Sequence, residues 1–445
     1  MITVAKLPLH PPSQISRTLC TPRFSAKAVL SFNLGIRSTK PRKKGGFLRL
    51  IWADYESGTS GGMELLRKLT RGCFPDSPKK GQKVEVESDN GGEDFFDAAT
   101  AESKVRPQHL VIMVNGLAGS AADWRYAAEQ FVKRVPDKII VHRSECNTSK
   151  LTFDGVDLMG ERLAEEVVNV VKNWPGLHKI SFVAHSLGGL IARYAIGRLF
   201  ELSARIGNAD QNEPSSVLEA NNSAKLHELC YEARIAGLEP VNFITFATPH
   251  LGSRGHKQLP LLCGLPFLER SASQTAHWIA GRSGKHLFLT DNDNGMPPLL
   301  LRMVEDSDDL KFMSALQAFK RRVAYANANY DHIVGWRTSS IRRQDELPKA
   351  KLLLKNEKYP HIVHVDQGSM EANNSRSLSM VGTEVIDLEE EMIRGLTQVP
   401  WERIDVSFQK STQRYVAHNT IQVNRYWLNS DGADVVQHMI DNFIV

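Results

Sequence analysis

Residues 180–190 read ISFVAHSLGGL and carry the clearest structural signal in this 445-residue chain. The mostly apolar run that ends at Ala184 is typical of a buried parallel strand, and the residues that follow repeat apolar side chains at helical spacing. Ser186 lies on the tight turn between them, where the backbone is crowded and small residues are needed two positions away on each side. Ala184 and Gly188 meet that need. The sequence therefore predicts a strand, a sharp turn and a helix, with a serine hydroxyl presented above a sheet.

Similar units recur along the chain. Continuous apolar runs predict further buried strands, and amphipathic stretches between them predict helices. The predicted strands are residues 109–114, 138–142, 179–184, 241–247, 322–326 and 403–406. The predicted helices are residues 123–135, 155–172, 187–200 and 433–443. Because strands that alternate with helices form right-handed βαβ units, we predict a doubly wound, mainly parallel α/β sheet with its site at the carboxyl ends of the strands.

Three long segments interrupt this alternation, at residues 204–238, 253–318 and 338–400. They exceed ordinary connections, and we expect them to be excursions around the site that include a lid. Within them, residues 259–268 (LPLLCGLPFL) are strongly apolar. In a loop, this composition predicts a lid or an acyl-chain wall that includes Leu262 and Phe267. A buried helix packed on the sheet is the alternative.

The turn at Ser186 suits nucleophilic chemistry. It raises the serine Oγ above the sheet and places the N–H of Leu187 at a helix N-terminus, where it can hold the oxyanion of a tetrahedral intermediate. A second donor is expected from the loop after the first strand, and the N–H of Leu117 is the candidate. The alternative is a plain tight turn, for which Gly116 would suffice. His185 precedes the nucleophile but points elsewhere on such a turn, so it is not expected to be the base.

Charge is distributed unevenly along the chain. Residues 1–53 contain ten Lys and Arg and no Asp or Glu, whereas the remainder has 45 basic and 50 acidic residues, a formal charge of −5. The mildly acidic remainder gives a nucleic-acid partner no electrostatic support. A basic, hydroxyl-rich, acid-free leader is typical of an organelle transit peptide, and the chloroplast is preferred over the mitochondrion or the cytoplasm. The alternative is a disordered basic tail, with residues 40–44 as a nuclear or membrane-surface patch.

The remaining composition sets the domain boundaries and excludes several classes of site. Residues 54–105 are expected to be a largely disordered linker, and residues 106–445 the folded domain. The five cysteines are scattered without a CxxC pair, so neither a disulfide framework nor a structural zinc site is expected. No apolar stretch approaches the ~18 residues that a membrane span needs. We therefore expect a soluble or peripheral protein that uses no metal or organic cofactor.

Three motifs together resemble a known family. They are AHSLGGLIAR at 184–193, FATPHLG at 246–252, and YAN at 325–327 followed by Asp331. In this order they are similar to the family named "putative serine esterase" (domain of unknown function 676), whose plant members are most similar. The resemblance implies an α/β-hydrolase fold over residues 106–445 and a lipase or esterase activity. The chain departs from the family pattern at Asn115, often His there, and at Gly335, near which the family often has Pro.

The resemblance also implies the partners of Ser186. Asp331 matches the family's acid and His418 its histidine, in the order Ser, Asp, His that this fold uses. The acids that compete with Asp331 are Asp291 and Asp293. The histidines that compete with His418 are His438, expected on the surface, His250, expected to line the substrate site, and His332, His361 and His364.

The expected activity is hydrolysis of carboxylic acyl esters through an acyl-enzyme. If residues 259–268 form a lid, the substrate is lipid-derived and contact with a lipid surface follows. An acyltransferase or thioesterase with the same three residues is one alternative. A non-catalytic α/β-hydrolase scaffold that binds a lipid or a protein is the other.

Overall fold

The computed structural model describes most of the chain from residue 85 onward. The described ranges are 85–88, 92–96, 107–204, 231–253, 280–292, 295–349, 356–368 and 387–445. All of them belong to one compact unit, Lys80–Val445. The expectations for residues 1–53, and those for Asp293, Leu262 and Phe267, fall outside the described residues and stay predictions.

The core of the fold is a nine-stranded sheet in the order β1-β2-β4-β3-β5-β8-β9-β11-β10. Its strands are β1 (Glu85–Ser88), β2 (Gly92–Phe96), β3 (His109–Val114), β4 (Ile139–Ser144), β5 (Lys179–His185), β8 (Glu239–Phe246), β9 (Arg321–Asn327), β10 (Ile362–Asp366) and β11 (Glu402–Val406). The six central strands, from β4 to β11, are parallel, and only β1, β2 and β10 run against their neighbours. The predicted α/β-hydrolase fold with a mainly parallel sheet is confirmed.

The register of the central strands brings their carboxyl ends together. Val114 of β3 pairs with Ala184 of β5. On the other side, Asn327 of β9 pairs with Val406 of β11. The turn after β5 and the loops after β3, β9 and β11 therefore leave the sheet at the same edge. This edge is where the candidate site residues are expected.

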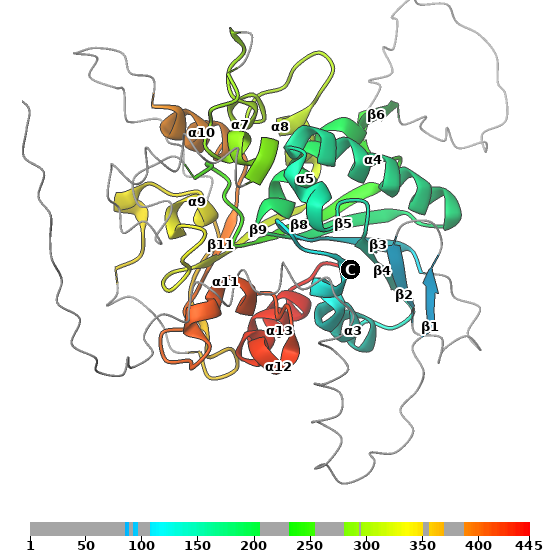
Figure 1. The fold of residues 1–445 in the computed structure, drawn as a ribbon. Helices are drawn as coiled ribbons and strands as arrows, with labels where there is room; N and C mark the ends of the chain where they lie inside the picture. Colours follow the sequence, from blue (N-terminus) through cyan, green and yellow to red (C-terminus); the bar gives the residue numbers. More distant parts are fainter. Residues whose placement is uncertain are drawn as a thin grey trace, which may run out of the picture. The chain divides into compact units, whose positions relative to one another are not determined.

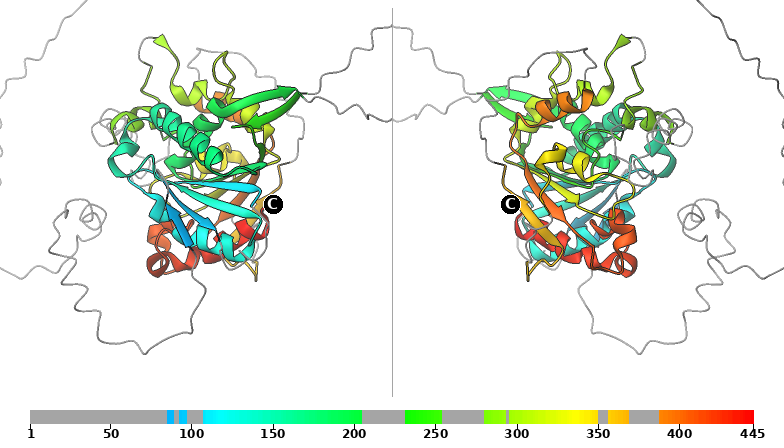
Figure 2. Two further views of the ribbon diagram at one scale, coloured as in Figure 1. Left: turned by 90° about the vertical axis from the view of Figure 1, so that its right-hand side faces the viewer. Right: turned by 90° about the vertical axis from the view of Figure 1, so that its left-hand side faces the viewer.

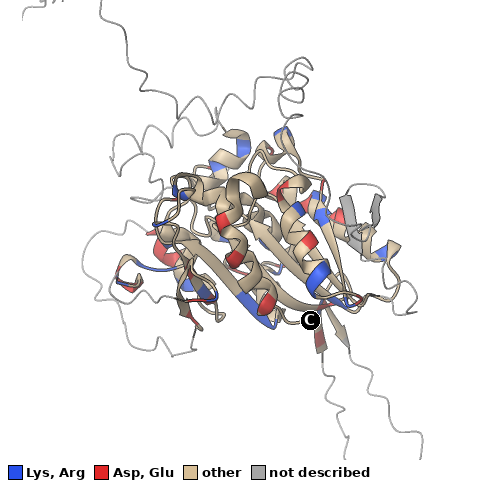
Figure 3. Cartoon of the chain, turned by 90° about the horizontal axis from the view of Figure 1, so that it is seen from below, with Lys and Arg blue, Asp and Glu red and all other residues tan. Residues whose placement is uncertain are grey.

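Helices cover both faces of the sheet (Figure 1). The upper face in Figure 1 carries α4 (Val156–Asn173), α5 (Leu187–Leu199), α7 (Leu299–Arg302), α8 (Phe312–Ala318) and α10 (Leu388–Leu396). The lower face carries α3 (Arg125–Arg134), α11 (Ala417–Thr420), α12 (Tyr426–Asn429) and α13 (Ala433–Asp441). The two side views of Figure 2 show the same three layers. Seen from below, basic and acidic segments are interspersed over the ribbon (Figure 3).

The alternation of side chains along each strand builds two cores. In β3, Leu110, Ile112 and Val114 pack in one apolar cluster with α4 and α5. Val111 and Met113 pack in the other, with α3 and α13. Successive strand residues point to opposite faces, so a strand covered on both sides is apolar throughout. This is why the continuous apolar runs of the sequence predicted the central strands correctly.

The structure adds elements at the margins of the sheet that were not predicted from the sequence. Part of the segment expected to be a disordered linker, residues 54–105, forms β1 and β2, and β2 pairs with β4. The long segments contribute β7 (Tyr231–Ile235), β10, α7, α8 and α10. β7 forms a two-stranded sheet with β6 (Phe200–Ala204), which ends where the first long segment begins. No described helix combines the length and apolar character that crossing a bilayer requires.

Candidate active site

The predicted turn between β5 and α5 has the strained geometry that a presented serine needs. Ser186 has φ of 52° and ψ of −127°, a conformation that residues with a Cβ rarely adopt. Its backbone N–H donates to the carbonyl of Phe246 on the neighbouring strand, at 2.8 Å. This hydrogen bond and the packing of β5 hold the strained residue in place, with its side chain directed out of the sheet edge.

Two glycines allow other backbone segments to approach this turn. A Cβ on Gly188 would lie 2.5 Å from the carbonyl oxygen of Asn115, inside the contact distance of any real side chain. A Cβ on Gly116 would lie 2.9 Å from the Cβ of Ser186. The loop after β3 therefore packs directly against the serine. Ala184, which replaces the usual glycine, is fully buried in β5 and tolerates its methyl group.

The structure brings Ser186, His418 and Asp331 together. Nε2 of His418 lies 3.0 Å from Oγ of Ser186, and Nδ1 of the same ring lies 3.0 Å from Oδ2 of Asp331. The serine follows β5, the aspartate lies in the loop after β9, and the histidine lies in α11, after β11. All three side chains are largely buried. Three residues far apart in the sequence thus form one continuous hydrogen-bonded chain.

The surroundings of Asp331 fix its charge. Burial raises the pKa of this carboxyl, but the neighbouring His418 and several hydrogen bonds outweigh burial and leave the pKa below its usual value. Oδ1 accepts from the backbone N–H groups of Ile333, at 3.0 Å, and Val334, at 2.9 Å. A carboxylate only accepts, so Nδ1 of His418 must carry the proton. Nε2 is then left with a lone pair facing the hydroxyl of Ser186.

Asn327, at the end of β9, links Asp331 to the segment around His418, which we call the histidine loop. Its Nδ2 donates to Oδ2 of Asp331 at 2.9 Å and to the carbonyl of Ala417, directly before His418, at 3.3 Å. No role was predicted for Asn327 from the sequence. Its position at the carboxyl end of a predicted strand was the available signal.

His185 supports the same loop from the other side. Its Nε2 donates to the carbonyl oxygen of His418 at 2.7 Å. Burial, aided by the neighbouring His418, lowers the pKa of His185 to about 3, so its ring is neutral at physiological pH. A ring whose Nε2 proton is committed to this carbonyl cannot take the proton of Ser186 through that atom. His185 is therefore a positioning residue.

The sequence profile of a family described as "Putative serine esterase (DUF676)" matches residues 104–341. The match spans more than half of the chain and includes Ser186 and Asp331, whereas His418 lies beyond it. The chain belongs to this family.

Two yeast proteins are similar to this family member over the same region. "Putative lipase C4A8.10" of Schizosaccharomyces pombe is 29% identical over 246 residues, which cover 52% of this chain and 26% of the yeast protein. "Putative lipase ROG1" of Saccharomyces cerevisiae is 29% identical over 240 residues, which cover 53% of this chain and 29% of that protein. The chain therefore matches less than a third of the length of either relative.

Solved structures show only a weak likeness. The mature form of Bacillus licheniformis lipase BlEst2 is 16% identical, with 51% of this chain and 68% of that chain covered, at a TM-score of 0.28. The Pyrococcus furiosus esterase PF2001 is 13% identical, with 59% and 77% covered, at a TM-score of 0.30. TM-scores this low support no conclusion about the chain. Its fold follows from its own strand order.

The two expected oxyanion donors belong to segments that adjoin Ser186, and their role stays a prediction. Leu187 is the first residue of α5, and the first N–H groups of a helix have no acceptor within the helix. Leu117 follows Gly116, whose Cα packs against the serine. Ala118, the next residue, has φ of 55° and donates its N–H to Oγ1 of Thr152 at 2.8 Å, which fixes this loop. A surface pocket bordered by residues 327–332 and 334–336 lies beside Asp331.

Two histidine predictions need correction. His250, expected to line the substrate site, is fully buried, with Nε2 3.0 Å from Oγ1 of Thr245. The backbone turns inward after β8, where Ala247 has φ of 45°, and this turn carries the ring into the core. His438, expected on the surface, is also buried, and its Nδ1 lies 2.8 Å from the hydroxyl of Tyr325.

The other candidates have structural partners away from Ser186. His361 pairs with Asp434 through its Nδ1 at 2.9 Å, and Asp291 accepts from the N–H of Leu299 at 2.8 Å. His332 is half-buried in the loop after β9. Nowhere in the described ranges do three or more His, Cys, Asp or Glu side chains gather as a metal site would require.

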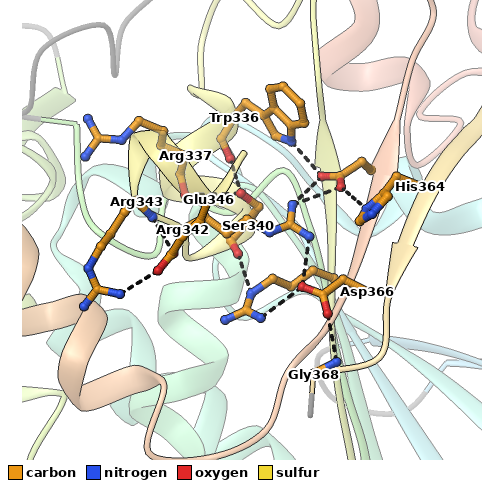
Figure 4. Close-up of polar contacts among 11 residues, drawn as sticks. Trp336, Arg337, Ser340, Arg342, Arg343, Glu346, His364, Asp366 and Gly368 are labelled. Carbon is orange, nitrogen blue, oxygen red and sulfur yellow. Dashed lines mark hydrogen bonds and ion pairs between the residues drawn. The ribbon is translucent and has the colours of Figure 1, made fainter. Parts of the chain in front are cut away.

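A second buried carboxylate anchors the loop that carries Asp331. Trp336, Arg342 and His364 converge on it (Figure 4), and it belongs to Asp405 of β11. Trp336 Nε1 donates at 2.6 Å, Arg342 Nη1 donates to both oxygens at 2.8 and 2.9 Å, and Nδ1 of His364 lies at 3.0 Å. Asp405 is fully buried. Because Trp336 begins α9 (Trp336–Ser340), this carboxylate fixes where the loop after β9 ends.

Ion pairs extend the anchor to α10. Arg337 of α9 pairs with Glu389, and Arg343 pairs with Glu390 at 2.5 Å. Arg342 also reaches Asp366 of β10, with 3.3 Å between Nη2 and Oδ2 (Figure 4). The segment after Asp331 is thus held by two strands and a helix at once.

Proposed function

We propose that this member of the serine esterase family hydrolyses carboxylic acyl esters through Ser186, His418 and Asp331. The observation that carries the proposal is the relay of two 3.0 Å contacts, from Ser186 Oγ to His418 Nε2 and from His418 Nδ1 to Asp331. The ionised Asp331 selects the ring tautomer whose lone pair faces the hydroxyl. A serine without a catalytic role would not need a histidine and an aspartate hydrogen-bonded to it in series.

The proposed reaction has two stages. In the first, Oγ of Ser186 bonds to the ester carbonyl carbon while His418 Nε2 takes its proton, and Asp331 stabilises the resulting imidazolium. The ester C–O bond then breaks, and His418 returns the proton to the leaving alcohol. In the second, water attacks the acyl-enzyme and gives a proton to His418. Ser186 regains that proton as the carboxylic acid leaves.

The negative charge on the oxygen of each tetrahedral intermediate needs hydrogen-bond donors on the side of Ser186 opposite His418. We assign this role to the N–H groups of Leu117 and Leu187. The packing of Gly116 on the serine and the position of Leu187 at the start of α5 support the assignment. Loss of one such donor typically lowers the rate by ~10²–10³.

The proposed substrates are lipid-derived acyl esters. The yeast relatives bear the name lipase, and residues 259–268 have the composition of an acyl-chain wall, with Leu262 and Phe267 as its proposed contacts. The reaction needs no cofactor. An alcohol or amine acceptor in place of water would turn the same chemistry into acyl transfer.

The test is active-site labelling with a fluorophosphonate and hydrolysis of p-nitrophenyl butyrate by the full chain. Ser186→Ala is expected to abolish labelling and to lower kcat by several powers of ten. Ser203→Ala, on the exposed part of β6, is the matched control and should leave both unchanged. Full activity of Ser186→Ala would refute the proposal.

A further inference from the structure

The short helix α12 exposes three large apolar side chains in a row. Tyr426 is 56% exposed, Trp427 76% and Leu428 42%. Trp427 is the most exposed of the large apolar side chains in the described part of the chain. Isolated exposed apolar residues are ordinary. Three consecutive ones that include a tryptophan indicate a surface that interacts with another molecule.

The helix is joined to the elements of the candidate site. Asn429 donates from Nδ2 to Oγ1 of Thr420, two residues after His418, at 3.0 Å. Tyr426 stacks on Tyr126, at the start of α3, with 5.0 Å between ring centroids. The loop between β3 and α3 is the one that holds Leu117. The exposed helix is therefore fixed to both the histidine loop and the proposed oxyanion loop.

Other exposed apolar side chains occur in the same neighbourhood. We define the site rim as three fully described segments, residues 115–126, 328–336 and 407–431, which include α11 and α12. Six of the fourteen exposed large apolar side chains in the described residues belong to this rim. They are Leu117, Ile333, Tyr415, Tyr426, Trp427 and Leu428. Exposed apolar side chains therefore recur in the three segments that carry Leu117, Asp331 and His418.

The charges of the site rim have one sign where they face solvent. Its exposed charged residues are Arg125, which pairs with Glu129 of α3 at 3.1 Å, and the bases Lys410 and Arg425. Its acids are less accessible, and each accepts a hydrogen bond or an ion pair. They are Asp123, bonded to Ser120 N, Asp331, bonded to His418, and Asp431, bonded to Ser411. An aromatic and aliphatic surface with exposed bases complements the interface of a bilayer that contains anionic lipid.

The structure assigns the site rim as a membrane-docking surface, with the headgroup layer of an anionic phospholipid bilayer as its occupant. Tyrosine and tryptophan have amphipathic rings that favour this layer, and arginine and lysine favour its phosphates. Docking would bring the segments that carry Leu117, Asp331 and His418 against the lipid. The inference rests on the proposed function and deepens it, because it makes membrane-resident esters the substrate class.

The first test measures co-sedimentation of the full chain with vesicles of phosphatidylcholine and phosphatidylglycerol. The double variant Trp427→Ser with Leu428→Ser is expected to bind about tenfold more weakly or worse, because two interfacial apolar side chains are lost. The matched control is Leu202→Ser with Tyr231→Ser. These residues are comparably exposed, at 62% each, but they lie on the two-stranded sheet of β6 and β7, which both side views place away from α12 (Figure 2). The control should bind like the unmodified chain.

A second variant tests the charge argument. Lys410→Glu is expected to weaken binding to the anionic vesicles about tenfold and to leave binding to pure phosphatidylcholine unchanged. Every variant keeps the basic residues 1–53, so their attraction to anionic lipid cancels in each comparison. Equal losses on both kinds of vesicle would overturn the electrostatic part of the assignment.

The third readout separates docking from catalysis. The Trp427 and Leu428 double variant should keep the kcat/KM of the unmodified chain for soluble p-nitrophenyl butyrate and lose hydrolysis of vesicle-borne ester in proportion to its lost binding. Unchanged vesicle binding would overturn the docking assignment, and Ser186-dependent hydrolysis of the soluble ester would still stand. A shift from dimer to monomer in that variant would also overturn it, in favour of a contact between two copies.

Discussion

His185 Nε2 donates a 2.7 Å hydrogen bond to the carbonyl oxygen of His418, and the two imidazole rings lie 4.7 Å apart between centroids. The residue before the proposed nucleophile therefore holds the backbone of the residue that would take its proton. Asn327 does the same for Ala417, one residue earlier. Two consecutive carbonyl groups of the histidine loop are thus fixed from two different strands.

We predict that His185→Ala lowers kcat for a soluble ester about 10²-fold with little change in KM, because a small displacement of His418 weakens proton transfer more than binding. Steady-state kinetics across pH would show the split. His185→Gln, whose amide can still donate to the carbonyl, should recover much of the loss. Equal kcat for the alanine variant and the unmodified chain would contradict a positioning role.

Asp331→Asn should lower kcat by ~10⁴, because the amide donates toward Nδ1 of His418 and favours the wrong tautomer. The structure around Oδ1 should persist, since the asparagine oxygen can still accept from the backbone N–H groups. Asp291→Asn is the matched control, because Asp291 is a buried acid that accepts from Leu299 away from Ser186. A comparable loss of kcat in that control would reassign the acid.

Stability should decrease below neutral pH, partly through His438. Burial, followed by the charge of Arg321, lowers the pKa of His438 to about 4 in the folded protein. The unfolded chain binds this proton near pH 6.5, so the free energy of unfolding falls as pH drops from about 6.5 to about 4 and levels off below. At pH 5 the loss is up to about 2 kcal/mol.

Urea denaturation of His438→Gln at pH 7.5 and pH 5 would measure this effect. Between pH 7.5 and pH 5 the free energy of unfolding should decrease in both proteins. The decrease should be up to about 2 kcal/mol smaller in the variant than in the unmodified chain. His178→Gln, at an exposed position, should leave the pH dependence as it is. An identical pH dependence in the His438 variant would show that its ring titrates as in the unfolded chain.

The buried carboxylate of Asp405 provides a prediction about stability. Asp405→Asn should lower the free energy of unfolding by about 3 kcal/mol or more, because the buried guanidinium of Arg342 loses its bidentate counter-charge and keeps only the longer 3.3 Å contact with Asp366. The double variant Asp405→Leu with Arg342→Met should recover part of that loss. Glu161→Gln, which breaks the half-exposed pair with Arg198, should cost less than about 1 kcal/mol.

The central sheet could be predicted because each parallel strand is buried on both faces and is therefore apolar throughout. β10 lacks this signal, since it lies at the edge and most of its side chains are half-buried or exposed. β1 and β2 are short strands in a charged segment. Their position in the sheet is defined only by the pairing of β2 with β4. Propensity alone does not identify strands of this kind.

The site was predictable to the extent that its signal is local. Ser186 has a strand, small neighbours and a helix around it within eleven residues. Asp331 and His418 lie 145 and 232 residues further along, and only the family resemblance pointed to them. The links made by Asn327 and His185 depend on backbone carbonyls that have no sequence signature. The prediction for His250 was wrong because the backbone turns inward at Ala247 and the histidine ring is buried.

The strand order has a consequence for protein synthesis. β10 is made before β11 but has no other neighbour in the sheet, so it stays unpaired until β11 emerges from the ribosome. His418 emerges later still. A nascent chain that already contains Ser186 and Asp331 therefore lacks the imidazole that links them, and the hydrogen-bonded chain of the site can form only after the segment that follows β11 has been made.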